Sequence, residues 1–242
     1  MPFQLILAAA ALVAGALASV TGFGIGSVLT PALATHTSTK VAVAAIAIPH
    51  FIGTLQRFWM LRRHVDRQVL RGFGIASAGG GLAGALAHGW LSSRALTIVF
   101  AVLVAGAGIG QLSGWMQRVR WGRTAAWVAG VLSGGLGGLV GNQGGIRTAA
   151  LLGFDVPKES FVATATAIGL FVDGARMPVY FATEWSDIAR IWPLVVVATA
   201  GVVLGTALGK RVLGHLPPNI FRPLVAVLLI ALGAYMALAG PR

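Results

Sequence analysis

The 242-residue sequence contains no cysteine. Disulfide bonds, thiolate metal sites and cysteine nucleophiles are therefore excluded, while the compartment stays open. Charge is also scarce, because charged residues make up 10% of the chain against about 25% in a soluble domain. Only 6 residues are acidic and 18 are basic, which gives a formal net charge of +12. Alternation of apolar and polar residues at period two is missing as well, which argues against a transmembrane barrel.

The short motifs of enzymes are also missing. The sequence has no H-E-x-x-H, no G-x-S-x-G and no Walker loop, so neither hydrolysis nor ATP coupling has a visible basis. Residues 79–84 formally match G-x-G-x-x-G, but no strand precedes them and no acidic residue follows at the required distance. We therefore expect no enzyme, no cofactor and no metal site.

Apolar sequence is what the chain has in abundance. Hydrophobic residues make up 57% of it and the mean hydropathy is +0.84. Runs near the length of about 20 residues that a spanning helix needs follow one another, at 3–35, 41–61, 72–91, 95–114, 124–153, 160–182, 191–209 and 220–239. We predict an all-α polytopic protein of the cell (inner) membrane, whose partner is the lipid bilayer. The basic residues lie in short loops, which indicates control of topology and not nucleic-acid binding.

The first and fifth runs are too long for one upright crossing, and glycines interrupt both. Each half of the chain thus has a glycine-broken segment followed by three ordinary spans. Three glycine pairs match between the halves with one common spacing: Gly53 with Gly174, Gly80 with Gly201, and Gly84 with Gly205. The pattern predicts a first transmembrane repeat at 1–114, a basic linker at 115–123 and a second repeat at 124–242.

Two topologies compete. Eight crossings would make the halves parallel repeats, whereas re-entrant hairpins in the first and fifth segments would leave six crossings and inverted repeats. Leaving out Arg57, Arg147 and Arg176, which lie within or beside apolar runs, the basic residues divide nine to six with eight crossings and eleven to four with hairpins. The larger asymmetry favours the hairpins, with both termini outside.

Charged residues within apolar runs are costly, so these three arginines are candidates for function. A guanidinium offers a fork of donors suited to an oxyanion. The alternatives are that Arg57 only begins a basic loop and that Arg176 pairs with Asp173, three residues earlier on the same helix face. His50 could relay protons, although such a histidine is more often a neutral packing residue.

The two glycine clusters are the second candidate, because unwound backbone in a membrane exposes amide groups and directs a following half-helix at a ligand. A simple packing kink is the alternative. From both sources together we expect a substrate site formed by Arg57, Arg176, Gly22, Gly24, Gly26, Thr30, Gly141, Asn142, Gln143, Gly144 and Arg147.

The chain resembles the TauE/SafE-type sulfite exporters and related anion permeases. The resemblance rests on the glycine cluster that precedes Pro31, on its repeat at 137–145, on the ending 173–180 with its Arg-x-Pro-x-Tyr pattern, and on the glycine stripes of the third and seventh runs. Phe23 and Ile25 interrupt the adjacent glycines usual in the first cluster, and Asn142-Gln143 replaces small residues in the second. The resemblance implies sulfite, a sulfonate or another small organic or sulfur-containing anion as the cargo.

The function expected from the sequence is therefore secondary transport of a small anion, with the site at mid-membrane between the two repeats. A membrane-embedded enzyme or assembly factor and a passive anion channel are the alternatives. Broken segments in both halves favour the transporter. The exact substrate, the direction of transport, the coupling ion and a homo-oligomeric state stay open.

Overall fold

The computed structural model describes residues 2–114, 123–142, 144, 147, 151, 158–213 and 218–239. Among these residues all regular structure is helical. The helices are α1 (Pro2–Thr21), α2 (Ile25–Ala34), α3 (Thr39–Leu61), α4 (Arg67–Val69), α5 (Ile75–Trp90), α6 (Ser93–Leu112), α8 (Arg123–Val140), α10 (Lys158–Arg190), α11 (Trp192–Leu213) and α12 (Pro218–Ala239). The expected all-α class is thereby confirmed.

Two of these helices, α3 and α6, begin with a serine cap close to the start of a predicted apolar run. The hydroxyl of Ser38 accepts a hydrogen bond from the N–H of Val41 at the start of α3, and Ser92 does the same for Ala95 in α6. These bonds satisfy amide groups of the first turn that have no partner within the helix. The caps therefore fix where the two helices start.

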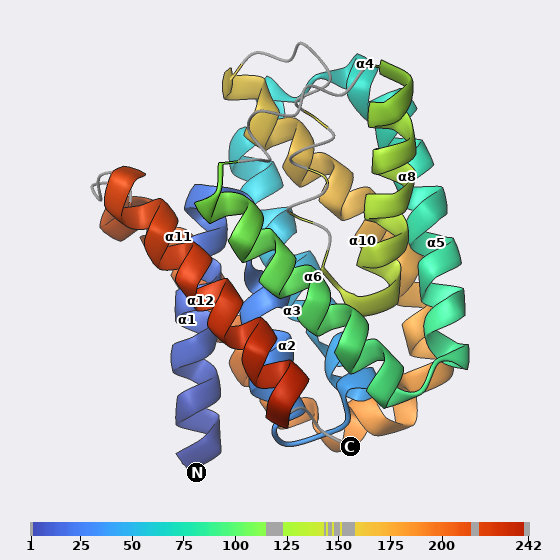
Figure 1. The fold of residues 1–242 in the computed structure, drawn as a ribbon, viewed down its shortest axis with the longest axis vertical. Helices are drawn as coiled ribbons and strands as arrows, with labels where there is room; N and C mark the ends of the chain where they lie inside the picture. The colour runs from blue at the N-terminus through green and yellow to red at the C-terminus, as the bar shows by residue number, and fades with distance from the viewer. Residues whose placement is uncertain are drawn as a thin grey trace.

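The first long apolar segment is two helices, α1 and α2, and the chain reverses between them (Figure 1). The ring of Phe3, at the start of α1, stacks on the ring of His36, just beyond α2, with centroids 4.5 Å apart. A continuous helix would hold these residues far apart, because it rises about 1.5 Å per residue. The segment is therefore a helical hairpin that turns at its glycines.

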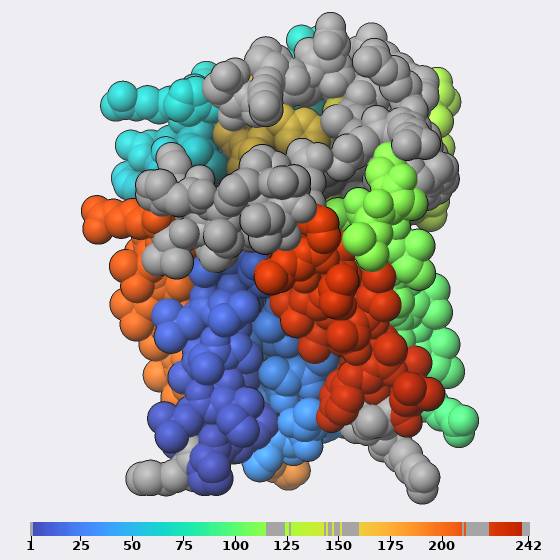
Figure 2. Space-filling view, turned by 60° about the vertical axis from the view of Figure 1, so that its left-hand side comes forward, coloured from blue at the N-terminus to red at the C-terminus, as the bar shows by residue number. Residues whose placement is uncertain are grey.

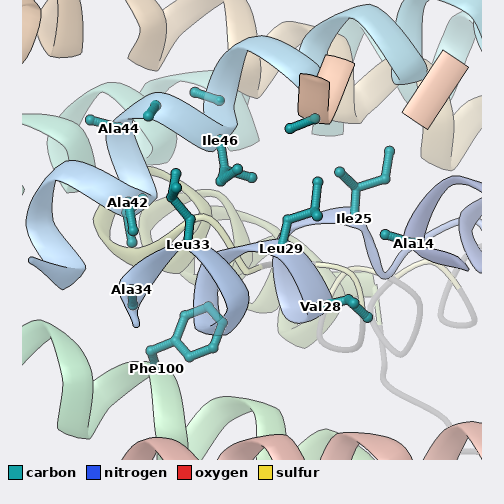
Figure 3. Packing of buried hydrophobic residues seen from close by; sticks show 14 of the residues in the cluster. Ala14, Ile25, Val28, Leu29, Leu33, Ala34, Ala42, Ala44, Ile46 and Phe100 are labelled. Carbon is teal, nitrogen blue, oxygen red and sulfur yellow. The ribbon is translucent and has the colours of Figure 1, made fainter. Parts of the chain in front are cut away.

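The short helix α2 lies inside the protein. Nine of its ten residues are buried. Figure 3 shows its aliphatic side chains between those of α3 on one side and Phe100 of α6 on the other. On the surface, α1 and α12 lie on either side of it (Figure 2). Helix α2 is thus enclosed by protein. This is the surrounding expected of a half-helix beside a broken segment, because irregular backbone within a membrane is tolerated only where protein or a cavity covers it.

The second glycine-broken segment also turns back. Helix α8 ends at Val140, and Leu151, eleven positions further, packs in one cluster with Ala129 of α8 and with Phe73. Leu151 could not reach Ala129 if α8 simply continued, because a helix carries each residue further along its axis. Both glycine-broken segments are therefore folded back on themselves.

The helices of the two halves pair in equivalent ways, so that exchanging each helix for its counterpart in the other half gives the same set of pairs. Helix α1 packs on α11, as α8 packs on α5, while α3 packs on α10 and α6 on α12 (Figure 1). The glycine stripes make the first two pairs close: a Cβ added to Gly84 would lie 1.9 Å from the carbonyl oxygen of Gly135 in α8, and one added to Gly205 would lie 2.1 Å from that of Leu12 in α1. Small residues let helix backbones approach closely in lipid.

Five helices of the described chain are long and apolar enough to cross a membrane: Pro2–Thr21, Thr39–His64, Arg67–Trp90, Ser93–Leu112 and Trp192–Gly209. Helix α10 is longer than any of them, with 33 residues, but carries several charged side chains. The run predicted at 160–182 therefore marks only the apolar part of a helix that continues to Arg190. The chain is an integral, multi-pass membrane protein.

Candidate functional site

The first glycine break lies between α1 and α2. Gly22 and Gly24 have φ angles of 80° and 124°, a region that side chains with a Cβ rarely adopt. The hydroxyl of Thr21 accepts a hydrogen bond from the N–H of Phe23 at 3.2 Å, which holds the turn. The first amide groups of α2 have no partner within the helix, so the positive end of this half-helix faces the break.

The second break begins at Gly141, where φ is 74°. Three side chains of other helices donate to the last carbonyl groups of α8. Arg176 binds the oxygen of Gly137 at 2.9 Å, Tyr180 binds that of Gly138, and Nδ1 of His88 lies 2.7 Å from that of Leu139. The broken end of α8 is therefore capped by α10 and α5.

The two breaks touch one another. A Cβ added to Gly26 would lie 2.5 Å from the carbonyl oxygen of Gly141, and one added to Gly144 would lie 2.2 Å from the Cβ of Phe23. Only a residue without a side chain fits at either contact. Two segments far apart in the sequence thus cross at their glycines in the interior.

Arg57 and Arg147 are buried, and some of their N–H donors have no acceptor among the described residues. Each is only 4% exposed. Nη2 of Arg57 donates to the hydroxyl of Thr54 at 3.0 Å, but Nε and Nη1 of both arginines have no hydrogen-bond partner among the described residues. The two arginines lie near each other on either side of Gly169. A Cβ added to Gly169 would lie 3.0 Å from Nη1 of Arg147 and 3.5 Å from Cγ2 of Thr54, the residue that Arg57 contacts.

Arg176 is buried too, but each of its nitrogens has a partner. Nε and Nη2 contact Oδ1 of Asp173 at 3.0 and 2.9 Å, and Nη1 binds Gly137. The structure therefore contains the pair of Asp173 with Arg176 that the sequence offered as the alternative to an anion-binding role of Arg176. The other carboxylate oxygen, Oδ2, lies 2.7 Å from Nδ1 of His50.

The charges of the described residues in this interior do not balance. Three arginines are buried at the centre, and Asp173 is the carboxylate that acts on all of them. Glu184, the other buried acidic residue of the described chain, lies 3.7 Å from Lys40 near the end of α10. Among the residues that the structure describes, this interior therefore carries an excess of positive charge, which a bound anion would neutralise.

Two neutral polar groups complete the candidate site. The hydroxyl of Thr30 and the amide nitrogen of Asn142 are both buried and have no hydrogen-bond partner in the described part of the chain. Thr30 lies one turn beyond Gly26 on α2, and Asn142 directly follows Gly141. Gln143, which we also expected at the site, lies outside the described residues.

The comparison with protein families decides which group this architecture represents. The model of the family described as "Sulfite exporter TauE/SafE" matches residues 7–236. The chain belongs to the sulfite exporter TauE/SafE family. Membership of the TauE/SafE family makes it a membrane transport protein for anions, in agreement with the resemblance seen in the sequence and with the expectation of a protein that is not an enzyme. No curated protein and no solved structure matches the chain.

Sequence reasoning missed three members of this TauE/SafE interior: His88, Tyr180 as a cap of α8, and the contact of His50 with Asp173. Tyr180 could have been found, because it ends the Arg-x-Pro-x-Tyr pattern. His88 gave no local signal, since its partner lies 51 positions away. Contacts of this kind follow from the packing of α5 on α8 and not from any spacing along the chain.

Proposed function

We propose that this protein transports a small oxyanion across the cell membrane, and that Arg57 and Arg147 bind it. The observation that carries the proposal is a pair of buried guanidinium groups, each with two nitrogens that have no hydrogen-bond partner in the described chain. A charge left unpaired in a membrane interior is unfavourable unless a counter-ion neutralises it. Sulfite or a sulfonate suits these donors, because its oxygens can accept from both guanidinium groups at once.

The crossing of the two breaks lies close to Arg147 along the chain and supports the same proposal. Arg147 follows Gly144, which contacts Phe23 of the first break. The unpartnered groups of Thr30 and Asn142 would bind oxygens of the anion on the side of the half-helices. In the same proposal, Arg176 holds the second break in place through Asp173 and Gly137 and does not need to touch the anion.

We further propose that the two hairpins are re-entrant and that the halves are inverted repeats. The matched pairings of α1 with α11 and of α8 with α5 support this. So does the reversal of the chain at each glycine break. A site between two inverted repeats can be opened to either side by moving one repeat against the other, which is how a secondary transporter works.

The test is transport by purified protein in liposomes, with labelled sulfite, sulfate, methanesulfonate and acetate. We expect sulfite or methanesulfonate to exchange faster than in protein-free liposomes. Arg57→Gln and Arg147→Gln should each weaken apparent affinity roughly ten- to a hundredfold, because a hydrogen bond to a charged group contributes about 1.5–3 kcal/mol.

Arg63→Gln is the matched control, because Arg63 is an exposed arginine of the loop after α3. It should transport like the wild type. Folded Arg57→Gln and Arg147→Gln proteins with unchanged affinity would refute the proposed binding site. Equal flux of all four anions with and without protein would refute anion transport itself.

A further inference from the structure

His50 joins α3 to α10 beside the proposed anion site. Its Nδ1 lies 2.7 Å from Oδ2 of Asp173, whose other oxygen, Oδ1, binds Arg176. His50 is 7% exposed and Asp173 is fully buried. Burial and the guanidinium groups of Arg176 and Arg57 oppose a proton on the imidazole, whereas the carboxylate favours it. A bound anion that offsets those guanidinium groups would therefore favour the proton.

The same face of α3 carries His50 and Arg57. His50, Thr54 and Arg57 follow one another at spacings of four and three residues, which places them in one line along a helix. Thr54 accepts the hydrogen bond of Arg57 and lies beside the position that Arg147 contacts at Gly169. A positive charge on His50 therefore lies on the same helix face as the groups proposed to bind the anion.

Within the described part of the chain, few other charged groups act on His50. Those that act on it are Asp173 and Arg176 of α10 and Arg57 of its own helix. Helix α2, which packs against α3, has no titratable residue. The basic residues of α6 and α11, which also contact α3, lie in the first turn of α6 and in the last turn of α11. Among these described groups, His50 is the one with an imidazole, the side chain whose ordinary pKa lies nearest neutral pH.

We propose that His50 binds the proton that is coupled to anion transport, so that proton and anion bind together and leave together. This inference rests on the proposed anion transport and adds its coupling ion. Among the described residues, the three arginines and Asp173 leave an excess positive charge without the proton, and the proton on His50 increases it. The proton therefore strengthens anion binding, and by reciprocity the anion strengthens proton binding.

The experiment measures sulfite binding to purified protein by calorimetry at about pH 6 and about pH 8, the range in which imidazole titrates. Buffers of different ionisation enthalpy report the protons taken up with each sulfite. Sulfite itself titrates in this range, but that contribution is common to wild type and variants and cancels in the comparison. His50→Gln can still donate a hydrogen bond to Asp173 but stays neutral, whereas His50→Lys keeps a positive charge.

We expect wild-type affinity to fall between the two pH values by about 5- to 150-fold more than that of His50→Gln, the usual range for coupled sites. His50→Gln should bind sulfite weakly at both pH values, and His50→Lys tightly at both. Both should take up fewer protons than the wild type. His64→Gln, which replaces an exposed histidine of the loop after α3, should keep the wild-type pH dependence.

If His50→Gln keeps the wild-type pH dependence and proton uptake, His50 is only a tether between α3 and α10, and the inference is overturned. Should His50→Gln fail to fold, His50→Lys decides in the same way. Should both fail to fold, wild-type protein that takes up no proton beyond those of sulfite itself overturns it. Wild-type protein that binds no sulfite at either pH contradicts anion transport as well, whereas binding without coupled protons contradicts only the role of His50.

Discussion

Three buried arginines share one interior but differ in what surrounds their guanidinium groups. Arg176 has a partner at each nitrogen, whereas Arg57 and Arg147 each have two nitrogens without a partner in the described chain. A paired guanidinium contributes to the fold, and removing it strands its partner. An unpaired one is available to a ligand. The difference gives opposite expectations for their variants.

Arg176→Gln should lower the amount of folded protein, because Asp173 would keep a buried charge whose one remaining contact among the described residues is His50. Breaking a buried pair costs about 3–5 kcal/mol. A second change, Asp173→Asn, should restore part of the loss by removing that charge. Thermal unfolding in detergent and the yield of monodisperse protein measure both effects.

Sulfite affinity of the folded fraction separates the two roles of Arg176. We expect it to change little in Arg176→Gln, in contrast to Arg57→Gln. A tenfold loss of affinity with normal stability would place Arg176 among the groups that bind the anion, as the sequence alone suggested.

The charges of the site could be predicted, but their pairing could only be predicted in part. An arginine within an apolar run is visible in any sequence, and so is the spacing of Asp173 and Arg176 on one helix face. The contact of His50 with Asp173 joins residues 123 positions apart. No local pattern encodes it, because it depends on the packing of α3 against α10.

At the scale of elements, the crossing of the two glycine breaks decides the shape of the site. Gly26→Ala should reduce transport and lower the unfolding temperature, because its Cβ would lie 2.5 Å from a backbone oxygen of Gly141. Neither backbone can shift without opening the crossing. Transport in liposomes and thermal unfolding of the purified variant measure the effect.

Gly174→Ala is the matched control, since a Cβ at that helical glycine meets nothing within 4 Å. It should leave transport unchanged and stabilise α10 by up to about 1 kcal/mol, the difference in helix propensity between glycine and alanine. Normal transport by Gly26→Ala would show that the breaks are packing kinks without a part in transport.

The predicted runs located the helices well but not their ends. The run predicted at 3–35 contains α1, the break and α2, as its glycines indicated. The run predicted at 160–182 ended too early, because the segment Glu184 to Arg190, which carries charged residues, continues α10. Hydropathy reports which part of a helix suits lipid, whereas helix ends depend on caps and backbone bonds.

At the scale of the whole molecule, the two halves contact each other through specific helix pairs. Comparing the two halves of the sequence could suggest that they are related, but not which helices pair. Matched glycines predicted two related halves. The structure shows two of the three pairs at equivalent contacts, as with Gly84 against α8 and Gly205 against α1. The third pair differs, because Gly53 packs on Val202 while a Cβ on Gly174 would meet nothing within 4 Å. Which helix each stripe would contact could not be predicted, because small residues permit close approach without choosing the partner.

The orientation of the molecule in the membrane is the last prediction. Helix α1 begins and α12 ends at one end of the molecule, together with the turn after α2, while the loop after α3 lies at the other (Figure 1). That loop carries Arg62, Arg63, Arg67 and Arg71. Basic loops stay in the cytoplasm, so both termini and the turn after α2 should lie outside.

Because the chain has no cysteine, single cysteines can test this without a background. Thr35→Cys and His64→Cys replace exposed residues at opposite ends. An impermeant maleimide should label Thr35→Cys in intact cells and His64→Cys only after permeabilisation, and a reporter fused after Arg242 should be active outside. If segment one crossed the membrane once, residue 35 would lie on the opposite side from the N-terminus. Labelling of His64→Cys in intact cells, or a cytoplasmic reporter, would contradict the re-entrant arrangement, because six crossings with both termini outside place the loop after α3 in the cytoplasm.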